Sequence, residues 1–175
     1  MTESAVINPI NRRFHTSTSS FQQPIFVFVQ IQHAMKQVIT YLSFNGNCRE
    51  AMLFYKECLG GKLYLQTIGE SPLSAKFSVK MKRCILQASL KNEKTTLMAT
   101  DMIGEAGLVK GNAVSILLDC STEEETREYY RKLSAGGLPT YPVRENYRGV
   151  LFGTLTDKYG NHWLLNFSRE DNLNY

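Results

Sequence analysis

The chain has 175 residues, of which 43% are hydrophobic, 11% aromatic and 21% charged. This length suits one domain or two half-sized modules, and the composition is that of a globular protein. Twenty basic and sixteen acidic residues leave a net charge of +4, with Lys and Arg scattered among the acids, which argues against a nucleic-acid-binding surface. No apolar run approaches the roughly 20 residues that a membrane span needs. We therefore predict no nucleic-acid partner and no membrane partner.

The four cysteines show no metal-site or disulfide pattern. Cys48, Cys58, Cys84 and Cys120 form no Cys-x-x-Cys pair and fall where helices and strands are expected. They are predicted to be buried, unreactive thiols, which fits a reducing cytoplasm.

The first 36 residues differ from the rest of the chain. They are rich in Ser and Thr, carry Arg12 and Arg13 with a single acid, Glu3, and contain the apolar run 25–29. We interpret residues 1–36 as an N-terminal extension that is disordered or adds an edge strand. A basic, acid-poor composition is also typical of an organelle transit peptide, so a targeting role stays open. Residues 169–175 are predicted to be a C-terminal tail.

The domain proper is predicted over residues 37–168 and begins with a strand and a helix. Residues 38–44 are rich in β-branched and aromatic side chains and are followed by the turn-forming run 45–47. Asn47 is placed to cap a helix, which Gly60 and Gly61 end. The apolar residues of this helix recur at three- and four-residue steps; they are Ala51, Leu53, Phe54 and Cys58.

Three further strands are predicted to complete a first module over about residues 37–100. Their ranges are 62–68, 84–91 and 95–100, and the last two are separated by a hairpin-length loop. Residues 69–83 alternate apolar and basic side chains, which predicts an exposed edge or a flap.

The same order of elements then repeats in a second module over about residues 113–168. A strongly apolar strand is followed by a hydroxyl N-cap, three glutamates and a helix that ends at Gly136 and Gly137. The strands of this module are predicted at 113–120, 140–144, 149–156 and 162–167. The repetition predicts an α+β fold made of two β-α-β-β-β modules.

At these residues the chain resembles the vicinal oxygen chelate superfamily, which includes glyoxalases, bleomycin-resistance proteins and dioxygenases, and within it the PhnB-like branch. The motifs that carry the resemblance are 41–48, Phe54-Tyr55 with 59–61, Phe152-Gly153 with 156–160, and Trp163. It covers about residues 37–168. The resemblance implies two modules whose strands form a U-shaped trough, usually completed in a homodimer.

Enzymes of this superfamily hold a divalent metal in the trough, at two positions in each module. The resemblance places these positions on Thr40, Met98, Ser115 and Leu164. None offers the imidazole, thiolate or carboxylate that such a metal needs. His162 is the one histidine inside the predicted domain. We therefore predict no metal and no cofactor.

Strand alternation predicts which side chains line the trough. His162, Leu164 and Asn166 share one face. By the same alternation, Leu117 and Asp119 lie beside Ser115, while Leu42 and Phe44 lie beside Thr40. The residues predicted to bind a ligand are Thr40, Leu42, Met98, Ser115, Leu117, Arg148, His162, Leu164 and Asn166. His162 is either such a polar contact or a structural histidine bonded to a nearby carbonyl, and Arg148 either admits an anionic ligand or is a solvated loop charge.

The sequence thus predicts a metal-free, cytoplasmic, homodimeric protein that binds an apolar or aromatic small molecule. The first alternative is a divalent-metal-dependent lyase, isomerase or dioxygenase with a displaced site at His162 and Asp101, Asp119 or Glu145, so catalysis is left open. The second is a dimerisation or interaction module. Methyl transfer, a role assigned to PhnB-like proteins, is not supported, because Gly104-Glu-Ala-Gly107 lacks the spacing and the helix of a nucleotide-binding turn.

Overall fold

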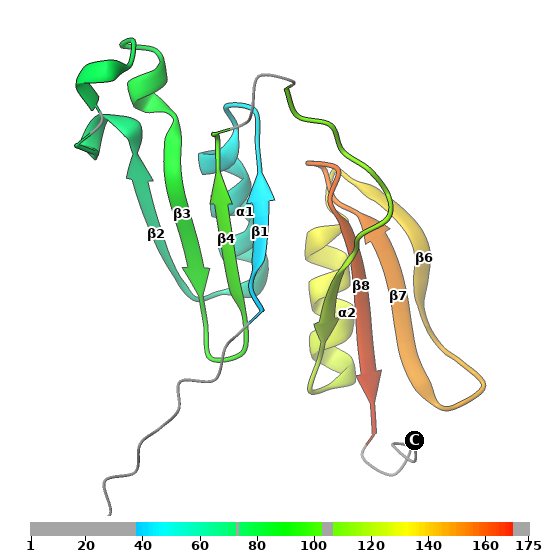
Figure 1. Ribbon diagram of the computed structural model, residues 1–175. Coiled ribbons are helices and arrows are strands. Elements are labelled where there is room, and N and C mark those ends of the chain that lie inside the picture. The colour runs from blue at the N-terminus through cyan, green and yellow to red at the C-terminus, as the bar shows by residue number, and fades with distance from the viewer. Residues whose placement is uncertain (1–37, 73, 103–106, 170–175) are drawn as a thin grey trace, which may run out of the picture. The chain divides into compact units, whose positions relative to one another are not determined.

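The computed structural model describes residues 38–72, 74–102 and 107–169 (Figure 1). These residues form two four-stranded sheets, each with one α-helix, in two successive β-α-β-β-β modules. The predicted α+β fold with two modules is confirmed. The predicted extension 1–36 and the tail beyond Arg169 lie outside the described residues. Within the described ranges, no helix is long and apolar enough to cross a membrane.

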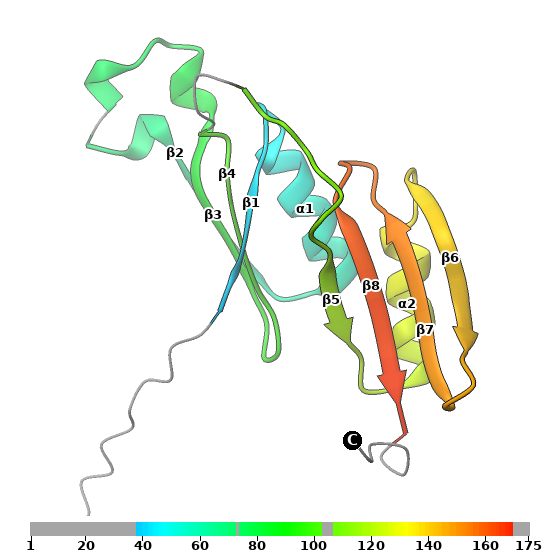
Figure 2. The same ribbon diagram turned by 45° about the vertical axis from the view of Figure 1, so that its right-hand side comes forward.

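In the first module, helix α1 packs against a mixed sheet. Its strands lie in the order β1-β4-β3-β2, with β1 parallel to β4 and the other neighbours antiparallel (Figures 1 and 2). The elements are β1 (Thr40–Ser43), α1 (Cys48–Leu59), β2 (Lys62–Thr67), β3 (Ile85–Lys91) and β4 (Thr96–Thr100). All five were predicted from the sequence, and each end lies within two residues of its predicted position.

The second module has the same connectivity. Its strands lie in the order β5-β8-β7-β6, with β5 parallel to β8, and helix α2 packs against β7 and β8 (Figure 2). The elements are β5 (Ile116–Asp119), α2 (Glu123–Leu133), β6 (Leu138–Glu145), β7 (Val150–Thr156) and β8 (His162–Ser168). The hydroxyl cap predicted before α2 is Thr122, whose side chain accepts a hydrogen bond from the Glu125 amide at 3.0 Å.

The segment between β2 and β3 is not the exposed edge strand that its alternation suggested. It contains three short 3-10 helices, at Ile68–Glu70, Ser74–Lys76 and Met81–Arg83. Ser71-Pro72 and local hydrogen bonds, such as the Thr67–Glu70 capping box, favour tight turns over a ladder. Its role as a flap stays a prediction.

The hydrophobic core draws on both modules. Its largest fully buried side chains include Trp163, Tyr55 and Phe44, each at most 1% exposed. Trp163 is therefore a core residue, as its position in the strand predicted. Helix α1 buries Met52 and Tyr55 on its sheet-facing side, whereas Leu53, predicted to lie on that side, is 44% exposed.

The start of α1 is capped from a distant part of the chain. Asn47 occupies the N-cap position, but its side chain makes no cap hydrogen bond. Instead, Oδ1 of Asp101, just after β4, accepts hydrogen bonds from the amides of Gly46 and Cys48, each at 2.9 Å. Its Oδ2 accepts from the Ile85 amide at 2.9 Å. Asp101 thus joins the first turn of α1 to the start of β3.

Replacing Asp101 with alanine is expected to lower the free energy of unfolding by about 2 kcal/mol, because three backbone amides lose their acceptor at once. Urea denaturation measures the change. The matched control is Asn47→Ala, which we expect to stay within about 0.5 kcal/mol of the wild type, since that side chain caps nothing. Equal losses in the two variants would contradict this assignment of the cap.

Candidate functional site

We use the term open face for the side of each sheet that is opposite its helix. In the second module, strand register places Leu117 opposite Leu164, and Asp119 opposite Asn166. The Asn166 amide donates a hydrogen bond to Asp119 Oδ1 at 3.1 Å. Trp163 and Leu165, which alternate with His162, Leu164 and Asn166, are buried. The structure therefore brings His162, Leu164, Asn166 and Leu117 together on one open face, with Ser115 exposed just before β5.

In the first module, the predicted faces of β1 are reversed. Thr40 pairs with Leu97, and Leu42 with Ala99, and both partners are buried in the core. Leu42 packs against that core and Phe44 is 1% exposed, so Thr40, Leu42 and Phe44 belong to the helix-covered side. Burying Leu42 and Phe44 in the core is more favourable than leaving these apolar side chains in water. This difference decides which face of β1 turns toward the helix. The open face of β1 carries Tyr41 and Ser43, with Tyr41 beside Met98.

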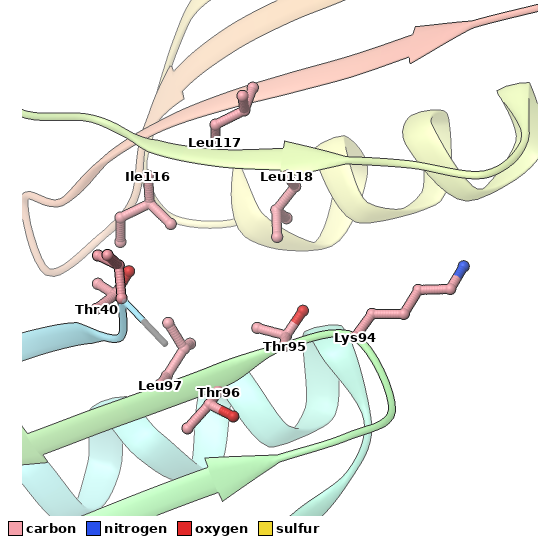
Figure 3. Close-up of a pocket in the computed structure, with 9 residues that line it drawn as sticks. Thr40, Lys94, Thr95, Thr96, Leu97, Ile116, Leu117 and Leu118 are labelled. Atoms are coloured by element: carbon pink, nitrogen blue, oxygen red, sulfur yellow. The ribbon is translucent and has the colours of Figure 1, made fainter. Parts of the chain in front are cut away.

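A small cavity lies where the β3–β4 hairpin approaches β5. In Figure 3, Ile116 and Leu118 point toward Thr40 and Thr95, while Leu117 points to the other side. The volume of this cavity is about 210 Å³, which is below the roughly 300 Å³ of the smallest typical small-molecule pockets. The Lys94 ammonium at its edge bonds to the Ser121 hydroxyl. This cavity is therefore a weak candidate for a ligand site.

A larger cavity of about 330 Å³ lies beside His162, and we call it the linker cavity because residues 108–111 form one wall. Its polar lining includes Tyr41 and Ser43 from β1, Lys110 from the linker, and Asn161 and His162 from the start of β8. Leu42, a predicted ligand contact, supplies apolar surface to this cavity together with Leu108, Val109, Val114 and Ile116. The volume and the mixture of apolar wall and few polar groups suit a small organic molecule.

His162 is held in place through one ring nitrogen. Its Nδ1 lies 2.9 Å from the hydroxyl of Thr156, its cross-strand partner on β7. Within the described part of the chain, no protein group is bonded to its Nε2. The imidazole is thus oriented by one contact and keeps one nitrogen for a ligand.

Lys110 ties the linker to the β7–β8 turn. Its ammonium donates to the Tyr159 carbonyl and, at 3.1 Å, to Asn161 Oδ1, and it lies 5.5 Å from the centre of the Phe44 ring. Partial burial lowers the pKa of Lys110, and the negative charge of Asp157 opposes that change. An ammonium has three N–H donors, so one remains after these two hydrogen bonds.

The residues present do not fit the divalent metal that the superfamily resemblance implies. Thr40 lies on the helix-covered side, while Met98 and Leu164 lie on open faces, and none of these side chains is a suitable donor. Among the described residues, no three His, Cys, Asp or Glu side chains come close enough together to hold a metal ion. Both Asp101 oxygens accept hydrogen bonds from backbone amides, so this carboxylate already has a structural role.

Arg148 lies in the exposed turn between β6 and β7. Its guanidinium is 5.4 Å from the centre of the Tyr147 ring, and its amide donates to Asn146 Oδ1. Arg148 does not line the linker cavity, so a ligand contact from this residue stays a prediction.

Sequence reasoning missed three polar residues of the linker cavity: Tyr41, Ser43 and Lys110. For β1 a signal was present, because Leu42 and Phe44 alternate with Tyr41 and Ser43, and the more apolar set faces the core. For Lys110 no such signal was present. A lysine in a loop is usually a solvated charge, and the contact of Lys110 with the β7–β8 turn depends on the tertiary structure.

All four cysteines are free, and Cys48, Cys58 and Cys120 are buried. Burial, followed by the negative charge of Asp101, raises the pKa of the Cys48 thiol to about 12. Burial is also the main cause that raises the pKa of Cys58 to about 11 and that of Cys120 above its ordinary value. These three thiols therefore hold little thiolate near neutral pH.

We expect the native protein to react with Ellman's reagent at pH 8 through about one thiol, that of the half-buried Cys84, because raised pKa values suppress the others. Unfolding in guanidinium should release the signal of all four. Cys84→Ser should remove the fast phase and Cys58→Ser should leave it. A fast phase that survives in Cys84→Ser would contradict this expectation.

The duplicated β-α-β-β-β order and the sheet orders β1-β4-β3-β2 and β5-β8-β7-β6 are the fold that the sequence resemblance implied. The chain belongs to the family described as 3-demethylubiquinone-9 3-methyltransferase, whose model matches residues 36–166. The resemblance to the PhnB-like branch is thereby confirmed.

Individual relatives agree with this family. Protein YjdN of Escherichia coli K12 is 29% identical over 139 residues, which cover 74% of this chain and 94% of that protein. The crystal structure of protein PA1353 from Pseudomonas aeruginosa matches with a TM-score of 0.66 and 32% identity, over 77% of this chain and 99% of that one. A PhnB protein from Bacillus cereus matches with a TM-score of 0.60 and 25% identity, over 76% and 100% of the two chains.

Proposed function

We propose that this chain is a metal-free protein that binds a small organic molecule in the linker cavity and on the adjoining open face. The observation that carries the proposal is the cavity of about 330 Å³ in which Tyr41, Ser43 and His162 offer polar groups beside an apolar wall. Leu117, 59% exposed, and the half-buried Leu164 extend the apolar surface along the second module. The ligand-binding roles of Met98, Ser115, Asn166 and Arg148 remain part of this proposal.

A neutral aromatic probe tests the binding. We expect 2-naphthamide to bind with a Kd below about 1 mM, the range for a fragment of its size. Val114→Glu should weaken binding at least tenfold, because the 79% exposed Val114 lines the cavity and a hydrated carboxylate would replace apolar surface that the ligand covers. The matched control is Leu138→Glu, at an apolar, 64% exposed position on β6 outside the cavity. Isothermal titration calorimetry gives the affinities.

Absence of binding, or equal effects of the two glutamate substitutions, would overturn the proposal. Native mass spectrometry of protein purified without chelator supplies a second test. A co-purified organic molecule supports the proposal. A stoichiometric divalent ion that His162→Ala removes would instead favour a metal-dependent lyase, isomerase or dioxygenase with a displaced site.

We further propose that the protein is a cytoplasmic homodimer. The open faces expose apolar side chains, namely Tyr41 (54%), Tyr64 (58%), Leu117 (59%) and Tyr141 (47%). A sheet face that exposes several large apolar side chains is commonly covered by a partner. Sedimentation equilibrium should give twice the monomer mass, and Tyr64→Glu should shift the protein toward monomer. A wild-type monomer at micromolar concentration would contradict this part of the proposal.

Methyl transfer, which the family description names, is not the function that we propose. A methyl-donor nucleotide usually sits at a strand-to-helix turn of a parallel sheet. Here each sheet contains one parallel pair, β1–β4 or β5–β8, and its other neighbours are antiparallel. The run Gly104–Ala106 lies outside the described residues.

A further inference from the structure

The linker cavity is rich in hydrogen-bond donors and poor in negative charge. Of the described residues that line it, none is an aspartate or a glutamate. Its polar groups are one ammonium, one imidazole, two hydroxyls and one side-chain amide. The amide of Asn161 is already engaged, because its Nδ2 donates to the Tyr55 hydroxyl at 2.6 Å and its Oδ1 accepts from Lys110. Every group that remains for a ligand can therefore donate a hydrogen bond, and the ammonium can only donate.

The positive charge of Lys110 has no carboxylate partner in an ion pair within the described residues. Its two acceptors are the uncharged oxygens of Tyr159 and Asn161. The carboxylate that acts on it electrostatically is Asp157, whose two oxygens already accept four hydrogen bonds from other residues. A cation without a paired anion at the wall of a cavity attracts a negatively charged group.

The apolar wall of the linker cavity indicates what the rest of the ligand, beyond its charged group, should be. Val109 and Val114 are 86% and 79% exposed, and both border the same cavity as Lys110. A ligand with an apolar body would cover these side chains and gain from the area removed from water. His162, Tyr41 and Ser43 line the same cavity and offer it an imidazole and two hydroxyls.

We infer that the ligand of the linker cavity is an amphipathic anion, a carboxylate or phosphate head group on an apolar or aromatic body, with the head group bound by Lys110. This inference rests on the proposed function, since it names the class of molecule that the cavity takes. Lys110 is the charged contact, and Val109 and Val114 face the body of the ligand.

Three naphthalene probes of matched shape test the inference by calorimetry: neutral 2-naphthamide, 2-naphthoate and 2-naphthyl phosphate. At low salt we expect at least one anion to bind tenfold or more tightly than the amide. Raising the ionic strength from about 0.02 to 0.5 M should reduce this ratio at least threefold, because screening weakens the contact with the ammonium. A preference for one anion over the other assigns the head group as carboxylate or phosphate.

Lys110→Met should reduce the anion-to-amide affinity ratio to about one, because the charge is lost while the length of the side chain is kept. Lys94→Met is the control: that lysine bonds to Ser121 and borders other cavities, so the ratio should stay as in the wild type. If Lys110→Met fails to fold, the salt dependence of the wild-type ratio still decides the question.

The outcomes separate the two proposals. If none of the three probes binds, the proposed function itself fails. If the amide binds and neither anion binds more tightly, the inference about the anion fails while the proposed function stands. An anion preference that Lys94→Met removes and Lys110→Met keeps would also overturn the inference.

Discussion

Replacing Asp157 with alanine is expected to lower the free energy of unfolding by about 3 to 5 kcal/mol, because several buried donors lose their acceptor together. Asp157 is 3% exposed at the end of β7. Its Oδ2 accepts from the Tyr55 hydroxyl at 2.7 Å and from Trp163 Nε1 at 2.8 Å. Its Oδ1 accepts from the amides of Tyr159 and Asn161, each at 2.9 Å. One carboxylate thus orders the last turn and fixes the core tryptophan.

The same carboxylate joins the two modules, since Tyr55 lies on α1 and Asp157 follows β7. Burial, and next the negative charge of Asp157, raise the pKa of Tyr55 well above its ordinary value. The hydroxyl therefore keeps its proton near neutral pH and remains a donor. Asparagine cannot replace this acceptor, because its NH₂ would face either the Tyr55 and Trp163 donors or the two backbone amides.

Urea denaturation monitored by Trp163 fluorescence and by circular dichroism measures the loss. Asp119→Ala is the control: this carboxylate is exposed and accepts one hydrogen bond, from Asn166, so a change within about 0.5 kcal/mol is expected. Tyr55→Phe and Asp157→Ala should be non-additive, because the second change removes a bond that the first has already broken. A loss below about 1 kcal/mol in Asp157→Ala would contradict the role of this residue.

Gly137→Ala should lower the free energy of unfolding by about 2 to 3 kcal/mol, the cost of overpacking a close backbone contact. A Cβ atom at Gly137 would lie 2.4 Å from the Thr156 carbonyl oxygen and 2.9 Å from the Asp157 Cα. These are backbone atoms of the segment that holds Asp157, so no side-chain rotation relieves the clash. The turn between α2 and β6 would have to move away from the end of β7.

Gly111→Ala serves as the matched control for this change. A Cβ atom at Gly111 meets no atom within 4 Å, and its backbone suits an L-residue, so equal or slightly greater stability is expected. Thermal and urea unfolding of both variants measure the difference. If the two alanine variants lose the same free energy, close approach is not the reason for glycine at position 137.

Much of the fold could be predicted from local patterns. Apolar alternation and the turn residues located all eight strands, and helical spacing located both helices. The Thr122 cap and the core position of Trp163 followed from single residues and strand parity. The faces of β5 and β8 were also predicted, because a mixed strand such as His162–Ser168 distinguishes its buried from its open side.

The candidate site was less predictable. The face of β1 was assigned wrongly from a superfamily position, although its own alternation places Leu42 and Phe44 in the core. The capping role of Asp101 spans more than fifty residues of sequence, and nothing near α1 signals it. Lys110 likewise bonds to residues that are distant from it in sequence, Tyr159 and Asn161 of the β7–β8 turn.

The sequence by itself determined the two β-α-β-β-β modules, because strand and helix periods and turn residues act over a few neighbouring positions. The residue types at Met98, Ser115 and Leu164, positions that the resemblance assigns to a metal, are unsuitable donors, and the sequence alone shows this. Only the tertiary structure decided which polar groups meet: Asp157 with Tyr55 and Trp163, and Lys110 with His162 around one cavity. The physical reason is that these hydrogen bonds and cavities form between segments distant in sequence, whose approach depends on the packing of the whole core.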